Sequence, residues 1–243
     1  MKKNIKILLC LLSVGATASS YATSQWVYFF SGGAGDELAS SKSQDIRLAD
    51  TPAPGLTNRF QTPMDSNPSF MASTGFGYQY HHVIFGLQGF MINTPHNYSK
   101  GIVHPQINVS PNFDTLAYHY KLKNYGVLAD FSWSWQFTPA LSSYFDAGLG
   151  VVWNRMYDYY ETPTVGSTAA PMLSPFRNRT QAAMAYTAGT GLQIPTHGIL
   201  LRIGYEFLYL NHARLSTNTI QSSSNVLKTG PLFVNMATLS VIL

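Results

Sequence analysis

Four ionisable side chains are the first candidates for chemistry in this chain: Asp130, Asp146, Arg202 and Glu206. Apolar and polar residues alternate around each of them, as in a β-strand, and each lies on the polar face. Two neighbouring carboxylates could act as a catalytic pair, and the four residues together could line a path for ions. The other interpretation is a paired charge network that fills a narrow interior, because buried charges are tolerated when they are paired and hydrogen-bonded. The sequence favours the charge network.

Histidine and serine side chains could support metal or hydrolase chemistry if they converged. A zinc site needs several ligands on one face, and a nucleophilic serine needs a histidine base that a carboxylate orients. Ser132 and Ser134 are predicted to point inward with no histidine at their level, and His119 lies near the outer end of the same strand. The histidines are scattered along the sequence: His81, His82, His96, His104, His119, His197 and His212. We therefore expect no metal, no cofactor and no catalytic residues.

The stretch from Ala129 to Trp153 shows which elements position the charged residues. Its two halves each alternate between an apolar face and a face of Asp, Ser, Gln and Gly, and Thr138-Pro-Ala-Leu141 connects them. Period two predicts strands, and the short connection predicts a hairpin. The apolar face carries Ala129, Phe131, Trp133, Trp135 and Phe137 in the first half, and Phe145, Ala147, Leu149, Val151 and Trp153 in the second. An apolar, aromatic-rich outside and a polar inside are typical of a transmembrane β-barrel.

The same alternation recurs through the chain and predicts eight strands, at residues 25–31, 70–80, 83–92, 115–137, 142–157, 181–194, 199–210 and 232–243. Three short turns alternate with four segments rich in Gly, Pro, Ser and Asn, which we interpret as long loops: Ala34–Asn67, Asn93–Asp114, Asp158–Arg179 and Asn211–Gly230. This pattern predicts an all-β fold, an eight-stranded antiparallel up-and-down transmembrane β-barrel that occupies residues 23–243. Lys121 and Lys123 share the face of Trp133, so we place them above the membrane.

Aromatic residues at the strand ends predict girdles at the two membrane interfaces. We assign the periplasmic rim to Trp26, Tyr80, Trp133, Trp135 and Phe137, and the outer rim to Phe30, Phe70, Trp153 and Tyr209.

The N-terminus and the composition agree with export to a membrane. Residues Met1–Ala22 have the features of a signal peptide: three lysines, a short apolar core and Ser20-Tyr21-Ala22 before the cleavage point. Cleavage would remove Cys10 and lower the formal charge from +4 to +1 (4 − 3), so the basic pI is no argument for nucleic-acid binding. Only 11% of residues are charged, against about 25% in soluble domains. No uncharged apolar run reaches the length of roughly 20 residues that a helical span needs.

The chain resembles the small eight-stranded bacterial outer-membrane barrels of the OmpA transmembrane-domain and opacity-protein type. The resemblance rests on the signal peptide, the eight-strand rhythm and segments such as Ser69–Tyr80 and Tyr144–Trp153. It implies an integral outer-membrane protein and insertion by the outer-membrane assembly machinery, which reads a C-terminal strand ending in an aromatic residue. Here the last strand ends in Leu243, a departure from that pattern.

The resemblance implies a surface antigen of the Gram-negative envelope, with a structural or adhesin-like role for its surface loops. Expected partners are outer-membrane lipids and a host or envelope ligand at the loops, and no nucleic acid. Three alternatives remain open. One is a membrane-embedded enzyme that modifies lipid A or acyl chains, for which His119 is the residue to watch. The others are a narrow channel through the interior and a soluble periplasmic β-sandwich.

Overall fold

The computed structural model describes residues 24–47, 57–94, 99–105, 115–167, 176–196, 198–217 and 226–243. The predicted signal peptide lies outside these residues. Every regular element in the described part is a β-strand, and none of its segments is a helix long and apolar enough to cross a membrane.

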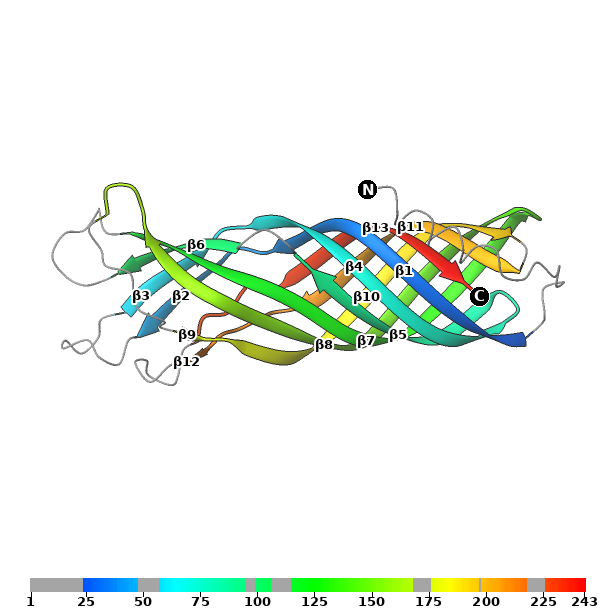
Figure 1. The fold of residues 1–243 in the computed structure, drawn as a ribbon, viewed down its shortest axis with the longest axis horizontal. Coiled ribbons are helices and arrows are strands. Elements are labelled where there is room, and N and C mark those ends of the chain that lie inside the picture. Colours follow the sequence, from blue (N-terminus) through cyan, green and yellow to red (C-terminus); the bar gives the residue numbers. More distant parts are fainter. Residues whose placement is uncertain are drawn as a thin grey trace, which may run out of the picture.

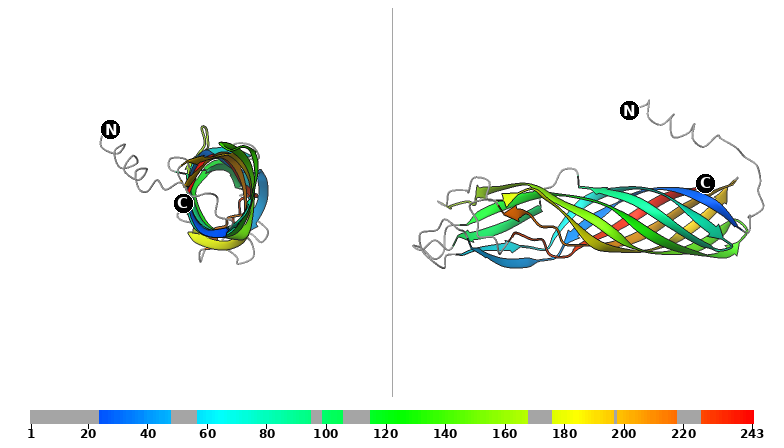
Figure 2. Two further views of the ribbon diagram at one scale, coloured as in Figure 1. Left: turned by 90° about the vertical axis from the view of Figure 1, so that its right-hand side faces the viewer. Right: turned by 90° about the horizontal axis from the view of Figure 1, so that it is seen from below.

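Eight long strands form a closed antiparallel ring. They are β1 (Ser24–Ala39), β4 (Asp65–Tyr80), β5 (Val83–Asn93), β7 (Leu116–Thr138), β8 (Leu141–Pro163), β10 (Arg179–Thr196), β11 (Ile199–Asn211) and β13 (Leu232–Ile242). Each pairs with the next, and β13 pairs with β1, so no strand edge is left in the ring. Seen along its long axis the sheet closes into a ring (Figure 2). The predicted fold class is confirmed.

One end of the barrel, which we name the turn end, carries the three short connections. His81-His82 links β4 to β5 with His81 at a φ of 53°, and Pro139-Ala140 links β7 to β8. Gly198, at a φ of 83°, precedes β11, and glycine adopts this left-handed conformation without a steric cost. Ser24 and the C-terminal residue Leu243 lie at this end as well (Figure 1).

The opposite end, the loop end, corrects the prediction of long loops. Three further strands continue the line of β1, β4 and β5: β2 (Lys42–Arg47), β3 (Thr57–Thr62) and β6 (Ser99–Pro105). They pair in the order β2-β3-β6-β7, and β7 and β8, at 23 residues each, run on beside them (Figure 1). The described residues of Ala34–Asn67 are therefore mostly strand, Asn93–Asp114 contains β6, and β8 takes the first part of Asp158–Arg179. Glycine, proline and asparagine are uncommon in strands, but this preference is weak. It can be overridden when one face of the strand packs against a core.

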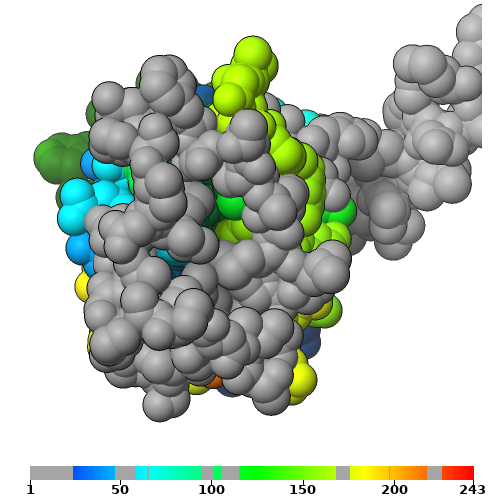
Figure 3. Space-filling model, turned by 90° about the vertical axis from the view of Figure 1, so that its left-hand side faces the viewer, coloured from blue at the N-terminus to red at the C-terminus, as the bar shows by residue number. Residues whose placement is uncertain are grey.

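The five strands β2, β3, β6, β7 and β8 form an extension of the barrel that we name the platform. Its open side is crossed by β9 (Phe176–Arg177) paired with β12 (Ser216–Thr217), and by a bridge between Arg214 and Lys228. The side chain of Gln44 joins β2 to the backbone of Lys228. Its Nε2 donates to the Lys228 carbonyl at 2.6 Å, and its Oε1 accepts from the Lys228 amide at 3.2 Å. Figure 3 looks onto this end, where the end of β8 stands at the rim in yellow-green.

The outer surface of the ring is a continuous apolar belt, as the alternation predicts. Phe131, Trp133 and Trp135 on β7 are 37%, 43% and 59% exposed, while Leu128 and Ser132 on the other face are buried. The belt spans residues 125–137 of β7 and equivalent lengths of the other ring strands. Its exposed members include Trp26, Phe76, Phe85, Leu149, Met184, Ile203, Phe207 and Leu239. A surface of this kind suits hydrocarbon rather than water.

Candidate functional site

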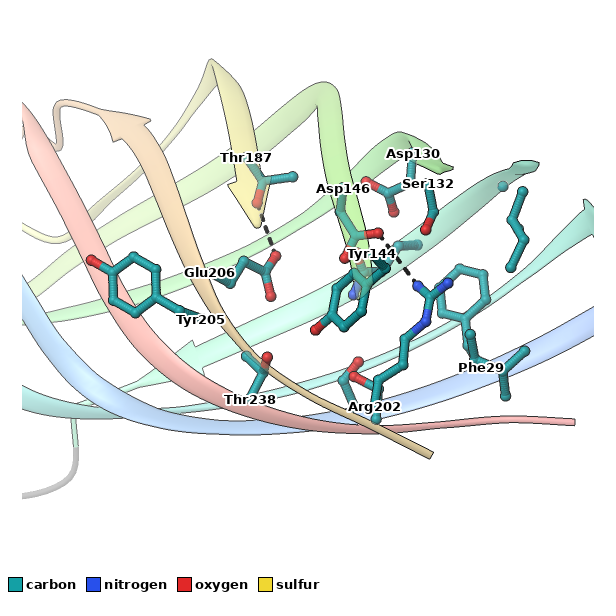
Figure 4. A pocket seen from close by; sticks show the side chains of 16 residues that line it. Phe29, Asp130, Ser132, Tyr144, Asp146, Thr187, Arg202, Tyr205, Glu206 and Thr238 are labelled. Carbon is teal, nitrogen blue, oxygen red and sulfur yellow. Dashed lines mark hydrogen bonds and ion pairs between the residues drawn. The ribbon is translucent and has the colours of Figure 1, made fainter. Parts of the chain in front are cut away.

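The four charged residues predicted for the interior lie around one cavity in the turn half of the barrel. Asp130 comes from β7, Asp146 from β8, and Arg202 and Glu206 from β11. The cavity measures about 70 Å³, enough for a few water molecules. Figure 4 shows the four side chains gathered around Tyr144, with Glu206 next to Thr187 and Arg202 reaching towards Asp146. The four residues predicted for the interior therefore line the same cavity.

Arg202 is the only cation at this cavity among the described residues, and it is held on three sides. Its Nη1 donates to Asp146 Oδ1 at 3.3 Å, its Nε donates to Gln193 Oε1 at 3.1 Å, and its guanidinium lies 4.5 Å from the centre of the Tyr144 ring. A planar guanidinium suits such a mixture of carboxylate, amide and ring contacts. Arg202 and Asp146 therefore form an ion pair whose geometry is fixed by the contacts of Arg202 with Gln193 and Tyr144.

The other two carboxyl groups are not paired with a cation among the described residues. Glu206 Oε1 accepts a hydrogen bond from Thr187 Oγ1 at 2.9 Å. Asp130 Oδ2 is buried with no hydrogen-bond partner in the described part of the chain. Three carboxyl groups thus face one guanidinium, so the predicted charge network is only partly paired. Nothing in this arrangement brings a nucleophile and a base together.

Two glycines make the cavity possible. A Cβ at Gly148 would collide with Asp130 and Thr187, and a Cβ at Gly204 would collide with the Tyr144 hydroxyl. Glycine at these two positions lets long polar side chains cross a narrow interior.

A second cavity of about 160 Å³ lies at the turn end and shares Ile84 and Arg202 with the first. Its lining is polar and includes Gln79, His82, Ser134, Gln136 and Gln193. The turn half of the interior therefore contains two cavities lined largely by polar residues, beside a small apolar cluster of Val27, Ile84 and Ile242.

The loop half of the interior is apolar, which the sequence analysis did not predict. A single cluster of buried side chains runs from the middle of the ring into the platform, and we name it the loop-half core. Within the ring it consists of Ala39, Met71, Phe90, Ile92, Leu122, Leu128, Val152, Met156, Ala185, Leu208, Leu210, Leu232, Val234 and Met236. Within the platform and the segments that cross its open side it consists of Ile46, Phe60, Val103, Leu116, Tyr118, Tyr120, Phe176, Ala213, Leu215 and Leu227. The sequence does contain a pattern that indicates this apolar interior, because strand ends such as Phe207-Leu-Tyr-Leu210 are apolar on both faces.

A buried carboxylate at the edge of the loop-half core was also missed. Glu37 is 3% exposed and accepts hydrogen bonds from Thr94 Oγ1 and Asn124 Nδ2, both at 2.7 Å. Asn154, opposite Asn124, donates to the carbonyls of Leu210 and His212 at 2.6 and 3.3 Å. These contacts tie β1, β7, β8 and the end of β11 together where the ring meets the platform.

Aromatic contacts fix the platform interior. Phe60 packs edge-on against Tyr118 and Phe176, with ring centres 5.7 Å apart in both pairs. The Tyr118 hydroxyl is hydrogen-bonded to Thr62 at 2.6 Å, and burial raises the pKa of Tyr118 to about 12. The interior of the platform is therefore packed, and its core is continuous with the apolar core of the ring.

His119 and the two serines are not assembled into a catalytic group. His119 stacks on Tyr160 at 4.7 Å, and its Nε2 lies 3.3 Å from Thr162 Oγ1. Ser134 donates to the His82 carbonyl, and Ser132 lies opposite Asp146 inside the barrel. The described residues contain no group of three or more His, Cys, Asp or Glu side chains placed to hold a metal ion.

The predicted girdle residues lie on the outward face. At the turn end Trp26 packs edge-on against Tyr78 at 5.5 Å, and Trp133 packs against Trp135 at 5.8 Å. Tyr80 and Phe137 are 56% and 60% exposed. Towards the loop end Trp153 stacks on Tyr125 and Tyr209 stacks on Tyr186. Phe70 lies opposite Asn93 near that edge, whereas Phe30 lies opposite Thr74, further down the belt.

Comparison with known proteins supports the architecture. No protein-family model matches the chain, and no curated protein matches it by sequence. Neisserial surface protein A is similar in structure, with a TM-score of 0.51 at 12% identity over 91% of this chain and 99% of that one. This chain has the fold of the small eight-stranded outer-membrane barrels. The outer-membrane protein OprG of Pseudomonas aeruginosa aligns at a TM-score of 0.46 and 15% identity, over 88% of this chain and 95% of that one. At these identities the likeness concerns the fold.

Proposed function

We propose that this protein is an integral outer-membrane protein, exported by its signal peptide, whose platform is a non-enzymatic, adhesin-like interaction surface. The observation that carries this proposal is the packed core of the platform. Strands that only needed to cross a membrane could end at the belt, yet β7 and β8 continue beyond it. Three further strands extend the sheet beside them around Phe60, Tyr118 and Phe176. Rigid scaffolds that present exposed segments commonly carry binding functions.

The platform presents side chains suited to contact with a partner. Ile102, Tyr160 and Arg59 are exposed on three different strands, and Arg59 is bound by Asp45 through two hydrogen bonds. Exposed aromatic and arginine side chains are frequent anchors in protein interfaces. The alternative of a lipid-modifying enzyme has no support from the contacts of His119 with Tyr160 and Thr162. The alternative of a channel is opposed by the loop-half core, which fills the loop half of the interior.

Adhesion of whole cells tests this proposal. A bacterial strain without its own adhesins would display the wild type or a variant with Arg59→Ala, Ile102→Ala and Tyr160→Ala, and attachment to epithelial monolayers would be counted. We expect the wild type to raise attachment and the variant to lose most of that gain, because the exposed side chains leave the buried core intact. His82→Ala with Gln136→Ala, at the turn end, is the matched control. Wild-type cells that attach no better than the empty strain would contradict the adhesin role.

A further inference from the structure

The outward face of β7 and β8 changes character at the loop-end edge of the belt. The last belt row across β5, β7, β8 and β10 is Met91, Tyr125, Trp153 and Ala182. The next outward row, two residues further on, is Asn93, Lys123, Arg155 and Thr180. The first row is apolar and ends in the stacked Tyr125–Trp153 pair, with ring centres 5.8 Å apart. The second row holds two cations flanked by two neutral hydrogen-bonding residues.

The two cations lie directly opposite each other in the sheet, Lys123 on β7 and Arg155 on β8. Like charges in this position destabilise a sheet, because the side chains leave the same face about 5 Å apart. Among the described residues neither one forms an ion pair. The carboxylate beside them, Asp158, is held by Lys121 at 3.0 Å, and Arg155 lies 5.3 Å from the centre of the Tyr157 ring. The pair therefore keeps its positive charge facing outward.

We propose that Lys123 and Arg155 bind a phosphate group on the headgroup of an outer-leaflet lipid, of the lipid A class. An outward position immediately beyond an aromatic belt is the level of the lipid headgroups. A phosphate between the two cations replaces their repulsion with charge-assisted hydrogen bonds. Asn93 and Thr180 extend the polar row on either side, and the acyl chains of the same lipid would lie on Tyr125 and Trp153. This inference concerns the wall of the barrel and does not depend on the proposed adhesin role.

Titration of the full-length, processed protein in a neutral maltoside detergent tests the site. Bisphosphorylated lipid A would be added and bound lipid counted by native mass spectrometry. The double variant Lys123→Gln/Arg155→Gln is expected to bind roughly tenfold more weakly or worse, since charge-assisted hydrogen bonds are lost. The exchange Lys123→Arg/Arg155→Lys should keep the affinity. Heat-modifiable gel migration checks that each variant is folded, and Arg155→Gln alone serves if the double variant is not.

The control Arg59→Gln/Lys228→Gln removes the same charge from the platform and should bind like the wild type. Lipid A without phosphates should bind wild type and double variant equally weakly. Equal affinity of the wild type and the double variant for bisphosphorylated lipid A would overturn the proposal. Displacement of the lipid by an equal concentration of inorganic phosphate would also overturn it, because the site would then recognise a free anion.

Discussion

The two halves of the barrel interior differ more than its outer surface suggests. In the turn half, Asp146 and Arg202 pair across a cavity that also receives Asp130 and Glu206. In the loop half, the same strands turn apolar side chains such as Leu128, Val152 and Leu208 inward. In both halves of the belt every second side chain points outward and is apolar, because it faces lipid. The side chains that point inward are under no such requirement and can be polar or apolar. The turn half therefore contains cavities and charged side chains, while the loop half is packed with apolar side chains and supports the platform.

The largest expected effect comes from removing an aromatic ring in the loop half. Phe60→Ala deletes a fully buried ring that contacts Tyr118 and Phe176, and such a change costs about 3–5 kcal/mol of unfolding free energy. Hydrogen exchange of the platform amides should therefore accelerate, while exchange in the belt strands should not. Phe29→Ala is the matched change in the turn half, where the half-buried ring borders the cavity. Equal loss of platform protection in both variants would remove the distinction between the halves.

Much of the ring could be predicted from the sequence, and the interior could be predicted only in part. The alternation around Trp133 and Trp135 gave the strands, the turns and the inward position of the charged residues, because side-chain direction follows from period two. The platform was missed because glycines, prolines and polar residues around Ile46 and Phe60 suggested loops. Contacts that join distant segments, such as Gln44 with Lys228 or Glu37 with Asn124, have no local pattern. The loop-half core was missed because a polar lumen was assumed along the whole barrel.

A smaller effect is expected from the buried hydroxyl of Tyr118 in the platform. Tyr118→Phe removes the hydrogen bond to Thr62 and should cost about 1 kcal/mol at neutral pH. Burial raises the pKa of Tyr118 to about 12, above the value of roughly 10 in an unfolded chain. The stability from the neutral hydroxyl is therefore complete below pH 10 and falls as the pH rises towards 12.

Urea unfolding of wild type and Tyr118→Phe at several alkaline pH values measures this effect. The wild type should lose stability more steeply than the variant between about pH 10 and pH 12, since the variant has no proton to lose at this position. Parallel curves would show that Tyr118 is not held neutral by the platform core.

Planar-bilayer conductance tests the division of the interior most directly. The wild type and Arg202→Ala would be inserted in parallel, with insertion verified by protease protection. Arg202→Ala enlarges the polar turn half but leaves Leu128, Val152 and Leu208 in place, and apolar constrictions exclude water and ions. We predict that neither protein shows steady conductance. A steady conductance in the wild type that shifts in Arg202→Ala would contradict the account, because ions would then cross the loop half.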